Sequence, residues 1–241
     1  MDLIISGDEM DIFSTIIFFA YAPALAILWY FYHEDKYEPE PKRFVIGTFI
    51  LGATLSIGIA MTVEAFLVRG SFGYALLPAT AFYMSLIAGF VEEPAKALAI
   101  RFPFKAGQMD GIMDGVVYGV AAGLGFAATE NFLYGIGYGV GTTIVRAFLT
   151  PFAHATWSAI VGVGYGLKAE GKIQNVSGYL ILGILLHFLW DYFTFLSLAI
   201  PAYYIFTILL IFINIAIIRY FIMVGQREDL EKMWWYWFDR G

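Results

Sequence analysis

The chain has 241 residues, of which 60% are hydrophobic and 14% are charged, whereas soluble domains carry roughly 25% charged residues. This composition excludes an ordinary soluble enzyme and a disordered scaffold, and a net charge of −6 without a basic tract argues against a nucleic-acid binder. The absence of cysteine excludes disulfides, thiolate metal sites and a cysteine nucleophile. We therefore expect a protein that lies in a lipid bilayer.

The apolar segments are long enough to cross a bilayer, which requires roughly 20 mainly apolar residues. The acidic start, from Met1 to Asp11, lacks the positive charge of a signal peptide, so we expect the first apolar segment to remain in the mature protein. Seven stretches qualify, in chain order: 12–32, 44–68, 76–100, 111–134, 141–167, 177–199 and 202–224. The sequence therefore predicts an all-α, polytopic transmembrane helical bundle of about seven spans.

Lysine and arginine are distributed unevenly between the two sides of this bundle. Ten lie in the loops after the first, third and fifth spans and in the tail, whereas the opposite side holds only Arg69. Because positive charge accumulates on the cytoplasmic side, this predicts an external N-terminus and a cytoplasmic C-terminus. We expect one bundle domain at 1–225 and, at 226–241, an interfacial tail that contains Trp234, Trp235 and Trp237.

Ionisable residues inside the spans mark a candidate site, because a charge near the bilayer centre costs about 2.5–3.5 kcal/mol. The residues concerned are Glu64, Glu92, Glu93, Lys96, Asp114, Glu130, Arg146, His154, His187 and Asp191. Any one of them could merely bond a neighbouring helix, but a purely structural bundle could use serine or asparagine at lower cost. The whole set therefore favours function.

The third span carries two adjacent glutamates. Lys96 follows Glu92 by four residues and Glu93 by three, so both carboxylates can meet its ammonium on one helix flank. Adjacent carboxylates in a low dielectric suit general acid or base chemistry. The alternative is an ion-pair lock between helices.

The histidines lie on two other spans. His187 and Asp191 are four residues apart and share a helix face, so the carboxylate can orient the imidazole. His154 begins a face that continues through Ser158. Glycines recur every fourth residue from Gly111 to Gly123, which permits close helix packing and draws Glu130 toward the bundle interior.

Carboxylates and imidazoles from four spans suit the activation of water. They could bind Zn²⁺ through three protein ligands, or a glutamate could act unaided while the histidines hold the oxyanion. The H-E-x-x-H, G-x-S-x-G and G-x-G-D signatures are all absent. A proton- or ion-coupled transporter and a non-catalytic membrane scaffold are the competing interpretations.

Five ordered motifs give the sequence a specific resemblance. They are Tyr37-Glu38-Pro39-Glu40-Pro41, Glu92-Glu93-Pro94-Ala95-Lys96, the pair Asp114-Gly115-Val116-Val117-Tyr118-Gly119 and Gly125-Phe126-Ala127-Ala128-Thr129-Glu130-Asn131, Pro151-Phe152-Ala153-His154-Ala155, and His187-Phe188-Leu189-Trp190-Asp191. Over most of its length the chain resembles the PrsW family of intramembrane proteases, in the group that includes CAAX prenyl endopeptidases and bacteriocin-processing proteins. The resemblance implies a membrane-embedded endopeptidase of a prokaryotic plasma membrane.

The resemblance also implies a substrate and a set of site residues. The substrate would be a single-span membrane protein of the anti-sigma-factor type, or a membrane peptide, with no nucleic acid involved. The implied catalytic residues are Glu92, Glu93, Glu130, His154, His187 and Asp191. A divalent metal, with zinc as the candidate, would be held by Glu130, His154 and His187. Asp191 replaces the asparagine of the CAAX relatives, which favours a support for a metal ligand over a neutral oxyanion donor.

Overall fold

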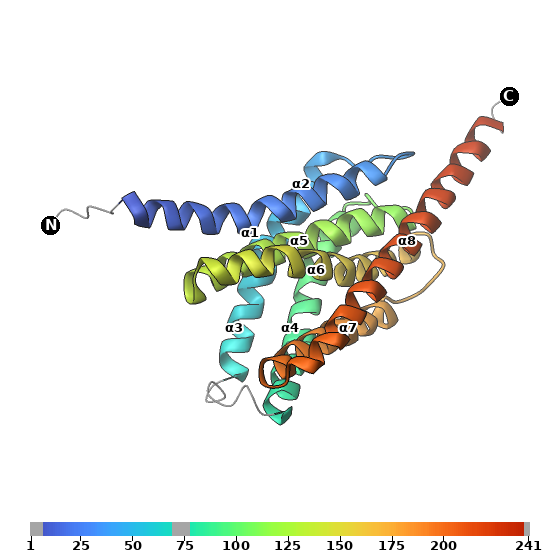
Figure 1. Ribbon diagram of the computed structural model, residues 1–241. Coiled ribbons are helices and arrows are strands. Elements are labelled where there is room, and N and C mark those ends of the chain that lie inside the picture. The colour runs from blue at the N-terminus through green and yellow to red at the C-terminus, as the bar shows by residue number, and fades with distance from the viewer. Residues whose placement is uncertain (1–6, 69–77, 239–241) are drawn as a thin grey trace.

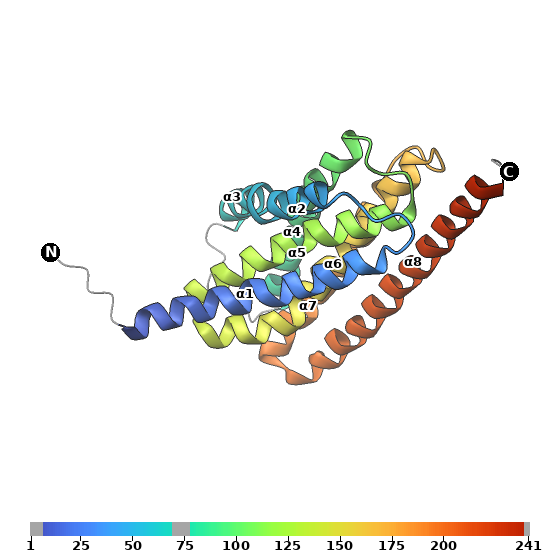
Figure 2. The ribbon, with the colours of Figure 1, turned by 90° about the horizontal axis from the view of Figure 1, so that it is seen from above.

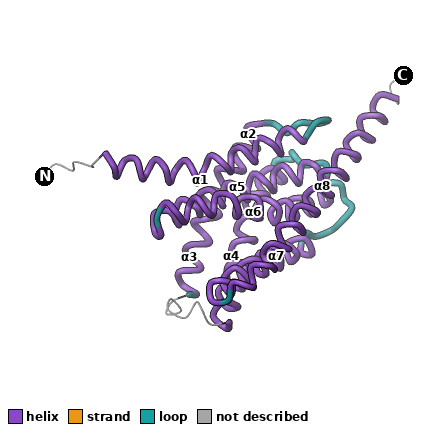
Figure 3. The backbone as a smooth tube through the Cα atoms, viewed as in Figure 1, coloured by secondary structure: helices purple, strands orange, loops and turns teal. Residues whose placement is uncertain are grey.

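A computed structural model describes residues 7–68 and 78–238, and in this part of the chain helices are joined by loops, with no strand (Figures 1 and 3). The elements are α1 (Gly7–Glu34), α2 (Lys42–Leu51), the π-helical turn η1 (Gly52–Ser56), α3 (Ile57–Leu67), α4 (Pro78–Lys105), α5 (Ile112–Tyr138), α6 (Val140–Ala169), α7 (Ser177–Ala199), the 3-10 turn η2 (Pro201–Tyr203) and α8 (Tyr204–Phe238). The predicted all-α class is confirmed.

Six helical segments of the described chain are long and apolar enough to cross a membrane. Two of them combine elements, because α2, η1 and α3 run on as one segment from Lys42 to Leu67 and η2 continues into α8. The third expected span, 76–100, corresponds to α4, a helix of 28 residues that contains Glu92, Glu93 and Lys96 and is not among these six. A polytopic helical bundle is thus confirmed, whereas the direction in which it crosses the membrane stays a prediction.

The α5–α6 pair forms the centre of the bundle. Helix α5 is buried over nearly its whole length, and α1 lies along both members of the pair (Figure 2). A Cβ atom at Gly115, Gly119 or Gly123 would collide with backbone oxygens of α6, at Gly162, Ser158 and His154 respectively. The predicted close approach is therefore confirmed, and it sets His154 directly against α5. Gly139, with φ +90°, allows the reversal between the two helices.

Helix α8 continues without a break past the predicted boundary at residue 225 and ends at Phe238. Near its start, Thr207 and Ile211 face the interior cavity described below. Farther along, Glu228 accepts a hydrogen bond from the backbone N–H of Ile112 at the start of α5, over 3.1 Å. Trp234 and Trp235 are exposed, the side chain of Trp237 is outside the part that the structure describes, and the division into two domains stays a prediction.

Candidate active site

Helix α4 supplies a buried charge cluster at the middle of the bundle. Lys96 Nζ lies 2.5 Å from Glu93 Oε1 and 3.5 Å from Glu92 Oε2. All three side chains are at most 7% exposed, so the helical spacing brings them together inside the protein. The predicted convergence of both carboxylates on Lys96 is confirmed. An isolated ammonium would be costly at this depth, and the two carboxylates together with the ring of Phe126, 4.6 Å away, offset that cost.

His154 on α6 is held from both sides of its ring. Lys96 Nζ lies 3.0 Å from Nδ1, and Glu130 Oε2 lies 3.3 Å from Nε2. Because an ammonium can only donate, Nδ1 is the acceptor and the proton is on Nε2, which donates to Glu130. Phe126 stacks on the imidazole at a centroid distance of 5.6 Å. The ring is thus fixed in one tautomer and one orientation.

His187 on α7 carries the opposite tautomer. Its Nδ1 lies 2.8 Å from Glu93 Oε1, which already receives the Lys96 ammonium and acts as the acceptor. Nε2 faces Glu92 Oε2 at 3.8 Å and Asp191 Oδ2 at 3.4 Å. Trp157 stacks on the ring at 4.3 Å, nearly parallel. The expected pairing of His187 with Asp191 on one face is therefore present, and Glu93 contributes the closer contact.

Glu130 on α5 is tied to α6 by Arg146. The guanidinium Nη2 lies 2.6 Å from Glu130 Oε2, and its Nε donates to Asn131 Oδ1 over 2.9 Å. The Thr150 hydroxyl donates to the same amide oxygen over 2.9 Å. This pairing assigns a partner to Arg146, whose role the sequence left open. Glu130 is drawn into the bundle, as the glycine stripe predicted.

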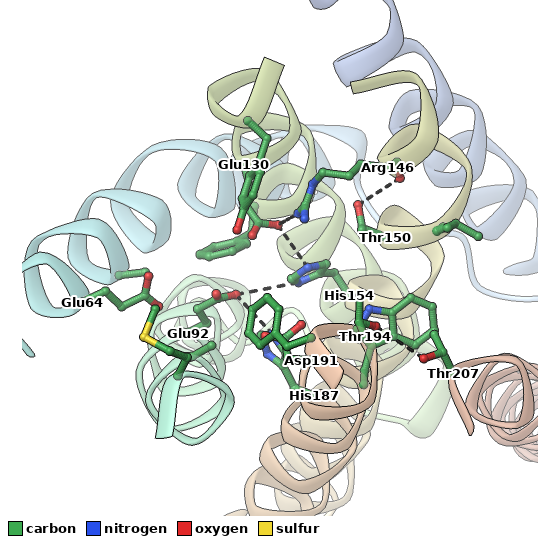
Figure 4. A pocket seen from close by; sticks show the side chains of 18 of the residues that line it. Glu64, Glu92, Glu130, Arg146, Thr150, His154, His187, Asp191, Thr194 and Thr207 are labelled. Atoms are coloured by element: carbon green, nitrogen blue, oxygen red, sulfur yellow. Dashed lines mark hydrogen bonds and ion pairs between the residues drawn. The ribbon is translucent and has the colours of Figure 1, made fainter. Parts of the chain in front are cut away.

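A cavity of about 470 Å³ opens beside these side chains (Figure 4). Its polar wall contains Glu92, Glu130, His154, His187 and Asp191, and most of the remaining wall is apolar. The lining residues come from α3, from the N-terminal halves of α4, α6 and α8 and from the C-terminal halves of α5 and α7. Those helix halves lie opposite the lysine-rich loops, so the cavity extends from the charged cluster toward that face of the bundle.

Three residues bring potential metal-ligand atoms together. The carboxylate of Glu92 and the imidazoles of His154 and His187 each offer one atom within 4.8 Å of the others, and all three side chains are buried. One oxygen and two nitrogen donors match the three-ligand sets of catalytic zinc sites, which leave a position for water. The sequence predicted Glu130, in place of Glu92, as the carboxylate ligand. In the structure Glu130 pairs with Arg146, and its role as a metal ligand stays a prediction.

Four residues of this site had no role in the sequence-based list of site residues. Lys96 was recognised only as a partner of the glutamates, and Arg146 only as a buried charge. Trp157 follows His154 by three residues, so its place on the same helix face was the available signal. Asn131 follows Glu130 directly, and its amide hydrogen-bonding capacity gave no indication of which helix it would bind.

The loop motif from Tyr37 to Pro41 lies elsewhere, against the N-terminal end of α5. Glu40 accepts a hydrogen bond from Tyr118, and its backbone N–H donates to Asp35 Oδ2 over 2.9 Å. Burial, reinforced by the charge of Asp114, raises the pKa of Glu40 to about 9. Burial also raises the pKa of Asp35 to about 7. This cluster does not line the cavity and serves to dock the loop.

Comparison with known proteins gives a consistent result. Residues 40–218 match the family described as "PrsW family intramembrane metalloprotease". Protease PrsW of Halalkalibacterium halodurans is 35% identical over 177 residues, which cover 71% of this chain and 80% of the relative. Protease PrsW of Geobacillus kaustophilus is 36% identical, covering 69% and 72%. Protease PrsW of Bacillus subtilis is 32% identical, covering 71% and 78%. No solved structure matches the chain.

Proposed function

Because this chain belongs to the PrsW family of intramembrane metalloproteases and is a membrane-embedded endopeptidase, we propose that Glu92, His154 and His187 form its hydrolytic centre. The observation that carries this proposal is the convergence of one carboxylate and two imidazoles, from three helices, on the wall of a single cavity. Family membership favours the protease over the transporter and scaffold interpretations.

The three residues are suited to hold a divalent metal ion, and we assign zinc to them. Bound zinc would supply Lewis acidity, lowering the pKa of a water molecule and polarising the scissile carbonyl. The surrounding residues prepare these ligands. Glu93 accepts the Nδ1 proton of His187, so the Nε2 lone pair faces the cavity, and Glu130 accepts the Nε2 proton of His154.

Proton transfer is assigned to Asp191. Its carboxylate lines the cavity 3.4 Å from His187 Nε2 and forms no ion pair with lysine or arginine in the described chain. In this position it takes one proton from the attacking water and returns it to the amine of the departing peptide. The remaining two residues of the predicted catalytic set, Glu93 and Glu130, act by holding the imidazoles.

The substrate is a membrane protein in the lipid bilayer, and we propose a single-span protein of the anti-sigma-factor type. The bilayer is that of a prokaryotic plasma membrane. An apolar cavity lined by the ends of several helices suits a substrate segment that has unwound enough to expose its backbone to water. The cavity volume of about 470 Å³ accommodates a few side chains and not a whole helix.

Cleavage of single-span peptides by the purified protein in detergent tests the assignment. The variants are Glu92→Gln, His154→Ala and His187→Ala, and His33→Ala is the matched control because His33 is exposed and far along the chain from the site. We expect cleavage by wild type and the control only, with a molar equivalent of zinc lost from the three site variants. Cleavage by all variants would overturn the site, and chelator-resistant cleavage would overturn the metal.

A further inference from the structure

Glu64 is the one carboxylate in the cavity wall whose role the proposed mechanism does not explain. It comes from α3, a helix that contributes no other ionisable side chain to the site. In Figure 4 its side chain projects from α3 toward the group formed by Glu92, Glu130 and His187. It lines the same cavity as Glu130, His187 and Asp191.

One oxygen of the Glu64 carboxylate is buried without a partner in the described part of the chain. Its Oε1 atom is fully buried and has no hydrogen-bond partner, and Glu64 forms no ion pair in the described chain. A buried acceptor without a donor is rare, because each one forfeits its hydration without compensation. By contrast, Glu93 contacts Lys96, Glu130 contacts Arg146, and Asp191 contacts His187. Glu64 is therefore poised to accept from a group that enters the cavity.

The charge balance of the site indicates what that group is. The site contains five carboxylates, at Glu64, Glu92, Glu93, Glu130 and Asp191, and two permanent cations, at Lys96 and Arg146. With all five carboxyls counted as ionised and both histidines neutral, as metal ligands must be, three negative charges are in excess. A divalent metal neutralises two of them. One negative charge remains, and the carboxylate without a partner is Glu64, so a single positive charge completes the site.

We propose that Glu64 forms a subsite for a positively charged side chain, lysine or arginine, of the substrate peptide. This inference rests on the proposed proteolytic function. The apolar side chains of Ile57, Met61 and Val68, near Glu64 in the chain, line the same cavity. They fit the methylene stem of a lysine while the ammonium reaches the carboxylate. In this low-dielectric wall a bound cation gains more than it would in water.

Kinetics with matched peptides test the subsite. Starting from a single-span peptide that the wild type cleaves, one residue at a time near the scissile bond is replaced by lysine, methionine or glutamate. At one position we expect kcat/KM to be about tenfold higher for lysine than for methionine, mainly through KM. Glu64→Gln removes this preference, and Glu64→Lys reverses it in favour of glutamate. Glu231→Gln, which removes an exposed carboxylate, leaves the preference unchanged.

A second readout does not depend on cleavage. The chain has no cysteine, so Val68→Cys introduces a single thiol on the cavity wall one helical turn from Glu64. At pH 8 we expect a cationic methanethiosulfonate to react about tenfold faster than an anionic one, and Glu64→Gln to reduce this ratio several-fold.

The two readouts separate the possible failures. Cleavage without a lysine preference at any position, or a preference that survives Glu64→Gln, overturns the subsite while leaving the protease intact. If the wild type cleaves no peptide, the proposed function fails in that assay, and the labelling ratio of the Val68→Cys thiol then tests the subsite by itself. A labelling ratio that Glu64→Gln does not change overturns the subsite on its own.

Discussion

The ammonium of Lys96 lies 3.0 Å from Nδ1 of His154, on the nitrogen whose lone pair a metal would otherwise occupy. The same ammonium lies 2.5 Å from Glu93, so it has a second, stronger partner on its own helix. Metal binding through this nitrogen therefore requires Lys96 to withdraw to Glu93. Lys96 thus supplies the positive charge that faces Nδ1 of His154 in this structure.

The first prediction concerns the proton on each imidazole. The chain contains three histidines, so a ¹⁵N-histidine NMR spectrum of metal-free protein contains only three imidazole patterns. We expect His154 as the Nε2–H tautomer, because Lys96 occupies Nδ1, and a Nδ1–H bond from His187 to Glu93. The His33→Ala spectrum identifies the exposed histidine. A His154 protonated on Nδ1 would contradict the Lys96 contact.

Replacing Lys96 by methionine should destabilise the protein. The substitution leaves Glu93 buried without its ion-pair partner, and breaking a buried pair costs about 3–5 kcal/mol. We expect a lower thermal unfolding midpoint for Lys96→Met and a partial recovery in Lys96→Met/Glu93→Gln, since the second change removes the uncompensated charge. Lys105→Met, at an exposed position on the same helix, is the control. Equal unfolding midpoints for Lys96→Met, Lys96→Met/Glu93→Gln and Lys105→Met would argue against the Lys96–Glu93 ion pair.

Arg146 should act through Glu130 and not on the substrate. Without the guanidinium, Glu130 loses the contact that aims it at His154, and supporting residues of this kind typically change activity or metal affinity by about 10–100-fold. We expect Arg146→Gln to lower kcat and zinc affinity with little change in KM, and Arg146→Lys to restore part of both. Arg227→Gln, on an exposed side chain, should behave as wild type. An effect confined to KM would contradict this role.

Contact between α5 and α6 predicts a sharp difference between two glycines of the same helix. A Cβ at Gly119 would collide with the Ser158 carbonyl, whereas a Cβ at Gly137 meets nothing within 4 Å. We therefore expect Gly119→Ala to destabilise by about 1–3 kcal/mol through overpacking, and Gly137→Ala to be neutral or slightly stabilising. Unfolding in denaturant followed by circular dichroism measures both. Similar losses for the two variants would argue against close packing of the backbones.

The docked loop predicts a pH dependence of stability. Asp35 and Glu40 bind protons more tightly in the folded protein, with pKa values of about 7 and about 9, than in the unfolded chain. The free energy of unfolding therefore falls as pH rises. The contribution of these two carboxyls to stability is complete below their unfolded pKa values and is lost as pH passes their folded pKa values. We expect the thermal midpoint to fall between pH 5 and pH 9.

The variant Glu40→Gln identifies the source of that dependence. A glutamine can still accept from Tyr118 but has no proton to lose, so the decline at the alkaline end should be shallower than in wild type. Glu231→Gln removes an exposed carboxylate and should keep the wild-type profile. A midpoint that rises with pH would contradict the raised pKa values.

Much of the fold followed from apolar length alone, because a helix that crosses lipid must satisfy its own backbone. The site was predictable where spacing along one helix decides which side chains meet, as for Lys96 with Glu92 and Glu93. The contact of His187 with Glu93 joins residues 94 positions apart, and helical spacing carries no information about such a pair. Similarly, Arg146 and Glu130 meet only because the glycine stripe brings α6 against α5.

The uninterrupted length of α8 has a mechanical consequence. Its 35 residues measure about 52 Å, whereas a hydrocarbon core is about 30 Å thick, so the helix stands well beyond the lipid at one end. Near its N-terminal end Thr207 lines the cavity, and farther along Glu228 accepts a hydrogen bond from the start of α5. Because α8 is one continuous helix that contacts both the cavity wall and the start of α5, it moves as a rigid body. A displacement of its protruding end would therefore also move Thr207 at the cavity wall.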